Sequence, residues 1–187
     1  MRELVYFVAT SIDGYIAGPD GDYSALLVEG DSLQALVERY PETLPEQARR
    51  ALGIDAPNRT FDAVLMGART YQVPGGLPSP YPHLGQYVVS DSVRAVPPDV
   101  SVLSGDLVAH VRALKQQDGL AIWLCGGGTL AAQLLPEIDR LVLKVSPVVL
   151  GRGVPLFDGA VPPTSFGSPR CESFANGVVF QEYARAR

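Results

Sequence analysis

The sequence predicts an α/β domain with a mixed, mostly parallel sheet, flanking helices and an antiparallel hairpin near its carboxyl end. Three observations support this prediction. Short apolar runs alternate with helix-like segments up to about residue 135, strand-like runs dominate afterwards, and an Asn-Gly pair stands between the last two runs. The 187 residues, of which 47% are hydrophobic and 19% charged, suit a single domain over residues 1–187.

The expected strands are short and apolar. Four almost continuously apolar runs have the composition of strands buried on both faces: 4–9, 61–67, 86–90 and 120–125. Alternation of apolar and polar residues predicts further strands at 100–104 and within 140–150. Asn176-Gly177, inside the segment 171–184, favours a hairpin with a type I′ turn, in which both central residues have positive φ.

Helical periodicity appears between these runs. Four segments carry it: 33–40, 43–53, 107–117 and 129–135. Asp31 or Ser32 is positioned to cap the first helix, and Asp106 to cap the third. Thr43 and Glu46 have the spacing of a capping box, in which two side chains satisfy backbone N–H groups reciprocally. Helices therefore alternate with the expected strands, as a parallel sheet requires.

Composition excludes several classes of function. The formal net charge is −5 and the 15 Lys and Arg residues form no stripe, which argues against nucleic-acid binding. The apolar run Leu4–Ala9 is too short for a signal-peptide core or a membrane span. Cys125 and Cys171 show no metal-ligand spacing. We therefore expect a cytoplasmic protein with reduced thiols, no metal site, no nucleic-acid partner and no membrane contact.

A glycine-rich turn is the most visible local motif. The stretch WLCGGGTLAAQLL, residues 123–135, joins an apolar strand through three glycines to a helix start, a geometry that binds anions. Residues 126–131 also satisfy the G-x-G-x-x-A dinucleotide pattern. A Rossmann domain requires an acidic residue about 20 positions further on. Glu137 and Asp139 come too early and Asp158 too late. A different fold is then expected, and the alternative is a plain tight turn.

Three further loops follow buried strands directly. The segment 9–21 contains two Asp-Gly turns, Arg69 and Thr70 follow the strand that ends near Gly67, and Ser90 follows another strand. An arginine and hydroxyls at such positions can bind phosphate. The alternatives are a plain surface loop, a solvated arginine and ordinary turn chemistry. In a parallel sheet these loops gather at one edge, so together they favour a phosphate-rich ligand.

Five stretches, taken together, resemble the dihydrofolate reductase-like superfamily, specifically the reductase-domain (pyrimidine reductase) family of riboflavin biosynthesis and its stand-alone bacterial relatives. They cover most of the chain in the expected order: SIDGYIAGPDG, VLMGARTY, YVVSDS, IWLCGGGTLAAQLL and IDRLVLKVSPVVLGRGVPLF. The resemblance implies a dihydrofolate reductase-like fold, an NADPH-dependent oxidoreductase activity, a small-molecule substrate and a homodimer.

The resemblance also implies ten cofactor-binding residues. Two lie beside the nicotinamide, three form a turn that holds cofactor phosphates, one lies beside the adenosine 2′-phosphate, and four form the turn against the pyrophosphate. In that order they are Ala9 and Ile16; Gly67, Arg69 and Thr70; Ser90; and Gly126, Gly127, Gly128 and Thr129.

The sequence also departs from the family in two ways. Dihydrofolate reductase has an acidic residue on its first helix that supports protonation of the substrate, and no one of Asp22, Glu29 and Asp31 aligns securely with it. The zinc deaminase domain of the bifunctional riboflavin enzymes has no counterpart here, because the H-x-E and P-C-x-x-C motifs are missing. The resemblance therefore gives the reductase class more firmly than the substrate.

The main hypothesis is hydride transfer from NADPH to a small heterocyclic, carbonyl or imine substrate near Asp13. Asp13 is the candidate catalytic residue, which orients the substrate or relays a proton. Its alternative is a turn aspartate that hydrogen-bonds to its own loop. Tyr81 either lines the substrate pocket or packs its loop. Two other functions stay open: a nucleotide-binding module of the same fold without turnover, and a dihydrofolate reductase-like activity.

Overall fold

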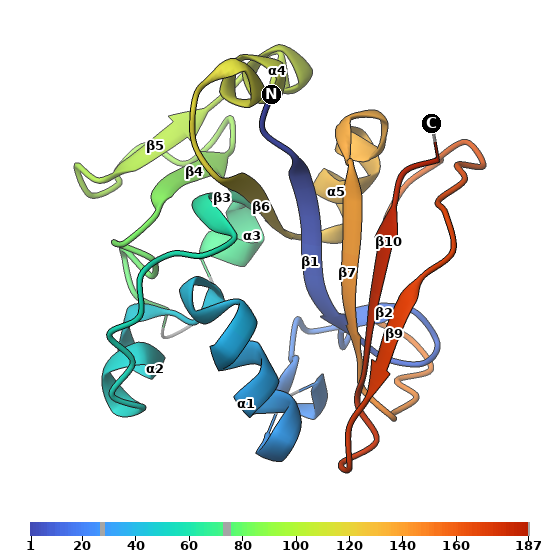
Figure 1. The fold of residues 1–187 in the computed structure, drawn as a ribbon. Coiled ribbons are helices and arrows are strands. Elements are labelled where there is room, and N and C mark those ends of the chain that lie inside the picture. The colour runs from blue at the N-terminus through green and yellow to red at the C-terminus, as the bar shows by residue number, and fades with distance from the viewer. Residues whose placement is uncertain (27–28, 73–75, 187) are drawn as a thin grey trace. The chain divides into compact units, whose positions relative to one another are not determined.

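The computed structural model describes residues 1–26, 29–72 and 76–186. Backbone contacts divide the chain into two compact units, each built from two segments. Unit 1 comprises Met1–Leu4 and Ala35–Cys125, and unit 2 comprises Val5–Gln34 and Gly126–Arg187. Figure 1 labels most elements of both units. The expectation of one domain over 1–187 stays a prediction.

Unit 1 contains four neighbouring strands in the order β5-β4-β3-β6. They span Val100–Leu103, Gly85–Val89, Phe61–Gly67 and Ala121–Gly126, respectively. β3 pairs with β4, and β4 with β5, in parallel. Val64, Leu65 and Ile122 are completely buried, as expected for strands covered on both faces. The four strands predicted for this part of the sequence are confirmed within one or two residues.

The helices of unit 1 confirm most of the predicted segments. They are η2 (Pro41–Thr43), α2 (Glu46–Ala51), α3 (Ala68–Tyr71) and α4 (Leu107–Gln116). Asp106 caps α4 as predicted, because its side chain accepts a 3.0 Å hydrogen bond from Ala109 N. The capping box is wrong. Thr43 belongs to η2, so its hydroxyl donates back to Tyr40 O, and α2 follows Pro45 without a side-chain cap.

Unit 2 contains four neighbouring strands in the order β1-β7-β10-β9. They span Leu4–Thr10, Arg140–Val145, Val179–Ala184 and Arg170–Ser173, respectively. β1 and β7 are parallel, whereas β10 is antiparallel to both of its neighbours. The predicted run 140–150 is shorter than expected. After Val145, Ser146 O accepts a hydrogen bond from Val148 N, so the chain turns away from the strand direction.

The remaining elements of unit 2 are short. β2 (Tyr15–Ala17) pairs in an antiparallel manner with β8 (Val154–Pro155). The other elements are η1 (Ser24–Leu26), α5 (Gly128–Leu134) and η3 (Leu135–Glu137). α1 (Gly30–Arg39) runs across the boundary between the two units in the chain.

The β9–β10 hairpin confirms the Asn-Gly signal but corrects the turn type. Gly177 has φ +83°, whereas no residue other than glycine has positive φ in the described part of the chain, so the turn is not type I′. Gly177 N donates to Phe174 O and Phe174 N to Val178 O, which fits a turn followed by a left-handed glycine. Asn176 instead uses its side chain to hold α1, donating to Glu29 O and Ser32 Oγ.

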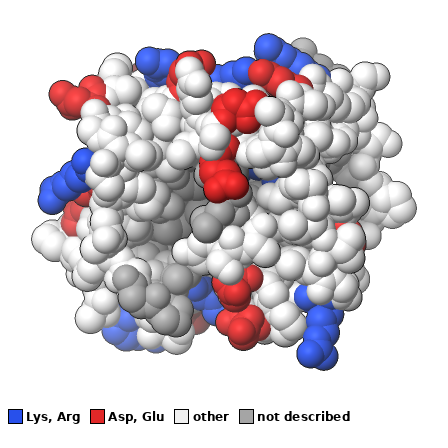
Figure 2. Space-filling view, turned by 90° about the horizontal axis from the view of Figure 1, so that it is seen from below, with Lys and Arg blue, Asp and Glu red and all other residues white. Residues whose placement is uncertain are grey.

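Parallel strands in both units and the antiparallel β9–β10 hairpin confirm the predicted α/β class with a mixed, mostly parallel sheet. Charged side chains of both signs are scattered among uncharged ones on the face seen in Figure 2. No helix among the described residues combines the length and the apolar character that a membrane crossing needs.

Candidate functional site

The predicted phosphate turn of unit 1 lies where two parallel strands end. Gly67, the last residue of β3, is paired in register with Val89, the last residue of β4. Gly67 immediately precedes α3, which carries Arg69 and Thr70, and Ser90 immediately follows β4. The structure therefore brings the two predicted phosphate segments of unit 1 to neighbouring strand ends. That the loops of unit 2 share this edge stays a prediction.

Arg69 has the accessibility that a phosphate ligand requires. Its side chain is exposed, and among the described residues no ion-pair partner contacts it. α3 is anchored next to it, because Tyr71 Oη donates a 2.6 Å hydrogen bond to Pro78 O. Burial and the nearby Asp99 raise the pKa of Tyr71, so its hydroxyl stays a protonated donor. The arginine therefore stands on a short helix with a fixed position.

Ser90 already serves its own turn. Its hydroxyl oxygen accepts hydrogen bonds of 3.0 Å from the backbone N–H groups of both Ser92 and Val93. Ser90 is buried, with 9% of its surface exposed. This geometry matches the turn-chemistry alternative for the stretch YVVSDS. The contact of Ser90 with an adenosine 2′-phosphate stays a prediction.

Asp13 in unit 2 is held by three donors from its own chain. Its carboxylate accepts hydrogen bonds from Ser11 Oγ (2.6 Å), Leu150 N (3.1 Å) and Gly151 N (2.7 Å). The hydrogen bond from Ser11, supported by those from the two backbone N–H groups, lowers the pKa of Asp13. The side chain is thus an anion at neutral pH. The hydrogen bond from Ser11 lies within its own loop, as the turn alternative predicts, whereas Leu150 and Gly151 are 137 and 138 positions further along the chain. The catalytic role of Asp13 stays a prediction.

The glycine turn brings Gly126 next to Ile16. Gly126 has φ +130°, a conformation that L side chains rarely adopt, and the Gly126–Gly127 peptide bond is cis. An ideal Cβ at Gly126 would lie 4.0 Å from Ile16 Cδ1, with no other described atom outside the local chain so near. Gly127 precedes α5 and no side chain caps the helix, so its first N–H groups stay available to another acceptor. The predicted pyrophosphate contacts of Gly126 and Gly127 stay predictions.

Gly128 and Thr129 are engaged by the protein itself. An ideal Cβ at Gly128 would lie 2.1 Å from Pro155 O, and Asp158 N donates a 3.1 Å hydrogen bond to Gly128 O. Thr129 Oγ1 donates to Asp158 Oδ2 at 3.0 Å. The third glycine therefore makes room for another segment of this chain. The predicted pyrophosphate contacts of these two residues stay predictions.

The segment 150–158 causes the crowding at Gly128. The sequence did not predict that this segment packs against the glycine turn. An ideal Cβ at Gly153 would lie 2.0 Å from Ala17 O. Leu156 N donates to Gly14 O, and Tyr6 Oη donates to Leu156 O, both at 2.9 Å. The segment therefore packs against both the loop after β1 and the glycine turn. The two glycines in LGRGVPLF were the available signal, because closely spaced glycines often mark close backbone approach.

Tyr81 packs its own loop in unit 1. Its ring lies 5.0 Å from the Trp123 ring, edge to face, and 6.3 Å from the His83 ring. Its backbone N–H donates to Gln86 Oε1 at 3.0 Å. Trp123 is 4% exposed, so the contact is part of the core. This geometry matches the packing alternative, and a substrate contact of Tyr81 stays a prediction.

Unit 1 contains a buried polar cluster that the sequence did not predict. Glu42 is fully buried, and its Oε1 accepts hydrogen bonds from Thr60 N (2.7 Å) and Phe61 N (2.8 Å) at the start of β3. His83 Nε2 lies 2.9 Å from Glu42 O, and burial lowers the pKa of His83. Arg49 donates to Pro41 O and Ala56 O. These groups tie loops together, and nothing in the local sequence pattern distinguishes them from surface charges.

Comparison with known proteins gives consistent results. The family model described as the RibD C-terminal domain matches residues 2–180. A protein of Bacillus subtilis (strain 168), "Uncharacterized protein YwjB", is 29% identical over 191 residues, which cover 99% of this chain and 99% of that protein.

Two solved structures share the fold. A putative riboflavin biosynthesis protein from Shewanella sp. PV-4 superposes with a TM-score of 0.73 and 26% identity, covering 100% of each chain. Dihydrofolate reductase from Enterococcus faecalis, complexed with NADP(H) and RAB-propyl, superposes with a TM-score of 0.64 and 14% identity, covering 99% of this chain and 97% of that one. These similarities confirm the predicted dihydrofolate reductase-like fold.

Proposed function

The chain belongs to the RibD C-terminal domain family, and from this premise we propose that it is an NADPH-dependent reductase that transfers hydride to a small heterocyclic, carbonyl or imine substrate. One observation carries the proposal most directly. Gly126 is a buried residue whose positive φ excludes side chains, and it lies beside Ile16 and close to a helix start that no side chain caps. Such a stretch of backbone suits an anionic cofactor.

Polar and apolar residues would hold different parts of the cofactor. Gly126 and Gly127 offer backbone to the pyrophosphate, and Arg69 offers a guanidinium to a phosphate. Ile16 and Ala9, both half-buried, offer apolar surface to the nicotinamide. When bound, the cofactor supplies the hydride. Asp13 then acts as a positioning residue, because its hydrogen bonds to Leu150 and Gly151 fix the loop that carries Ile16.

Cofactor binding is tested by titrating the protein with NADPH and with NADH and following the fluorescence of Trp123, the single tryptophan. We expect a saturable response. Arg69→Ala should weaken NADPH binding about tenfold, and more than NADH binding, because one charge-assisted contact to the 2′-phosphate is lost. Arg170→Ala, which removes an exposed arginine from β9, is the matched control. Equal weakening of both nucleotides would reject the role of Arg69, and no saturable response would reject the cofactor.

A binding module without turnover is the second candidate, and the engagement of the Asp13 carboxylate by three donors favours it. A panel of pterins, pyrimidines and aldehydes separates the two candidates. NADPH oxidation with any member supports the reductase, whereas saturable NADPH binding without oxidation supports the module. The family and the Shewanella neighbour make a heterocycle of riboflavin biosynthesis the first substrate to examine.

We further propose that the protein is a cytoplasmic homodimer. The resemblance to the reductase family supports the dimer, and light scattering on a size-exclusion column measures its mass. A monomer of 20.0 kDa at micromolar concentration would contradict it.

A further inference from the structure

The tip of the β9–β10 hairpin is fastened to the start of α1 by hydrogen bonds within unit 2. Asn176 Nδ2 donates to Glu29 O at 2.9 Å and to Ser32 Oγ at 2.8 Å. Ala175 N donates to Asp31 Oδ2 at 2.8 Å. We call these three contacts the clamp. Both donors of the Asn176 amide are used in it, and the red tip lies beside the lower end of α1 in Figure 1.

Asn176 is followed by Gly177, and this pair is suited to an intramolecular reaction. The backbone nitrogen of the next residue can attack the side-chain carbonyl carbon, Cγ, of an asparagine. Glycine has no Cβ to hinder that approach, and asparagine is among the thermolabile residues of proteins. Gly177 is exposed and has φ +83°. The reacting pair therefore lies in a turn at the surface.

The reaction conserves all atoms with water as the only other reactant. A bond forms between Gly177 N and Asn176 Cγ, the Cγ–Nδ2 bond breaks, and the proton of the Gly177 N–H leaves with the amide nitrogen as ammonia. Water then opens the resulting succinimide ring at one of its two carbonyl carbons. The product is aspartate or isoaspartate at position 176, and nothing is oxidised or reduced.

The folded hairpin opposes this reaction. Gly177 N donates to Phe174 O at 2.9 Å, and Asn176 Oδ1 accepts a hydrogen bond from Val178 N at 3.2 Å. Together with the two hydrogen bonds from Nδ2, these contacts hold both the attacking nitrogen and the amide in place. Attack on Cγ therefore requires the tip to open first, and the rate follows the fraction of molecules that are open.

A carboxylate at position 176 does not restore the clamp. It has no N–H group to donate to Glu29 O, and the Ser32 hydroxyl already donates to that oxygen at 2.7 Å. The carboxylate of Asp31, which accepts from Ala175 N, would then meet a second negative charge at the tip. Like charges at close range repel each other. The reaction therefore removes two hydrogen bonds and adds repulsion at the start of α1.

We propose that Asn176 is a deamidation site, and that its conversion to aspartate or isoaspartate releases the hairpin tip from α1. The closed clamp protects the amide, so conversion is slow in the folded protein. Once made, the carboxylate is not reversed by refolding, and the contact between the hairpin and α1 is lost permanently. This inference goes beyond the proposed function and uses neither its cofactor nor its substrate.

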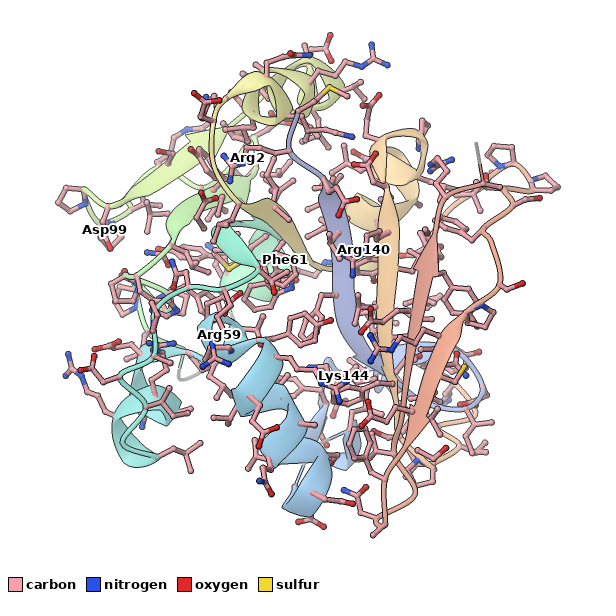
Figure 3. The ribbon with its side chains drawn as sticks, viewed as in Figure 1. Arg2, Arg59, Phe61, Asp99, Arg140 and Lys144 are labelled. Atoms are coloured by element: carbon pink, nitrogen blue, oxygen red, sulfur yellow. The ribbon has the colours of Figure 1, made fainter. Side chains whose placement is uncertain are left out.

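The first test follows deamidation of the full chain in mildly alkaline buffer by peptide mass spectrometry. Asn58, the other asparagine of the chain, is the internal control. It precedes Arg59, which Figure 3 labels, and its side chain donates to His83 O at 2.8 Å. We expect Asn176 to convert and Asn58 to persist. In guanidinium chloride, conversion at Asn176 should be at least about tenfold faster, because the hydrogen bonds of the clamp are lost.

Two variants examine the clamp itself. Ser32→Ala removes one acceptor of the Asn176 amide, and we expect conversion in the folded protein to become about fivefold faster. Ser173→Ala, which changes an exposed serine on β9, is the matched control and should leave the rate unchanged. Asn176→Asp copies the product, and hydrogen exchange of its hairpin tip and of the first turn of α1 should be faster than in wild type. Deamidated wild-type protein, separated by anion exchange, gives the same measurement without a substitution.

Each outcome decides the inference. Persistence of Asn176 in the folded chain, or equal conversion of Asn176 and Asn58, overturns the site. Equal rates in the folded and unfolded chain, or an unchanged rate in Ser32→Ala, overturn protection by the clamp. Deamidated protein that exchanges hydrogen like wild type overturns the release of α1. NADPH titration of the same samples tests the proposed function separately.

Discussion

Two turns join a strand to a helix: β3–α3 in unit 1, and β6–α5 where the second segment of unit 2 begins. Both turns contain glycine, but the reason for the glycine differs between them. Both helices follow a glycine and neither has a side-chain cap. Gly67 has φ −73°, which any residue adopts, whereas Gly126 has φ +130°. Gly128 is crowded by Pro155 O. Gly128 is therefore explained by the packing of the protein itself, whereas for Gly67 and Gly126 a ligand is the proposed explanation.

The largest expected effect belongs to Gly128→Ala. Its new methyl group would meet Pro155 O at 2.1 Å, so one of the two backbone segments must move. We expect the free energy of unfolding to fall by about 3 kcal/mol, the upper range for overpacking. Gly167→Ala is the control, because its new methyl group would lie 3.6 Å from Ala184 O, an ordinary contact, and it should stay within about 1 kcal/mol of wild type. Equal urea midpoints for the two variants would contradict the packing explanation.

Gly126→Ala should lower the free energy of unfolding less than Gly128→Ala does, but it should have a larger effect on NADPH affinity. The strained φ of +130° predicts a loss of about 2 kcal/mol in the free energy of unfolding. The added methyl group would also contact Ile16 at the turn proposed to approach the pyrophosphate, so NADPH affinity should fall further than stability alone explains. Denaturation and fluorescence titration on one preparation separate the two effects. Unchanged NADPH affinity in the folded variant would remove Gly126 from the proposed cofactor site.

The hydrogen-bonded carboxylate of Asp13 makes the stability of the protein depend on pH, because it holds the loop that packs beside the glycine turn. Its pKa is lowered in the folded protein, so the unfolded chain binds this proton more readily. Its contribution to stability is then present above about pH 4, the ordinary pKa of aspartate, and is lost as the pH falls through the folded pKa. The difference in unfolding free energy between wild type and Asp13→Asn should be positive at pH 7 and shrink in acid. A pH-independent difference would show that the charge is unimportant.

Gly67→Ala should have the smallest effect on stability. Because φ is −73°, alanine fits this backbone, and we expect a change of no more than about 1 kcal/mol. If phosphate approaches this backbone, the same variant weakens NADPH binding. A stable variant with unchanged NADPH affinity would show that neither packing nor a ligand requires glycine at position 67.

Most of the secondary structure could be predicted because it depends on local periodicity. The runs around Phe61–Gly67 and Leu107–Gln116 carry clear apolar patterns, and Asp106 caps its helix as its type predicts. The errors arise where distant groups compete for a side chain. Asn176 holds α1 instead of adopting positive φ, and Thr43 turns back to Tyr40.

The candidate site was predicted less completely than the fold. Its glycines and Arg69 were visible, since residue type after an apolar run is a local signal. The contact between Asp158 and Thr129 was not, because it depends on a segment that returns from 29 positions further along the chain. The buried carboxylate of Glu42 was invisible for the same reason, as its donors are Thr60 N and Phe61 N. Such contacts depend on which distant segments meet in the folded protein. The local periodicity of a single sequence does not indicate which segments meet.

The parallel pairing of β1 with β7 has a consequence for how the protein is made. Val5 lies beside Arg140, so two adjacent strands are separated by most of the chain. At synthesis rates of about 5–20 residues per second, β1 is made roughly 7–27 s before its β7 partner. Its buried residues, among them Phe7, have no β7 to pair with during that interval. Unit 2 therefore folds late, and nascent chains are expected to depend on chaperones until β7 emerges.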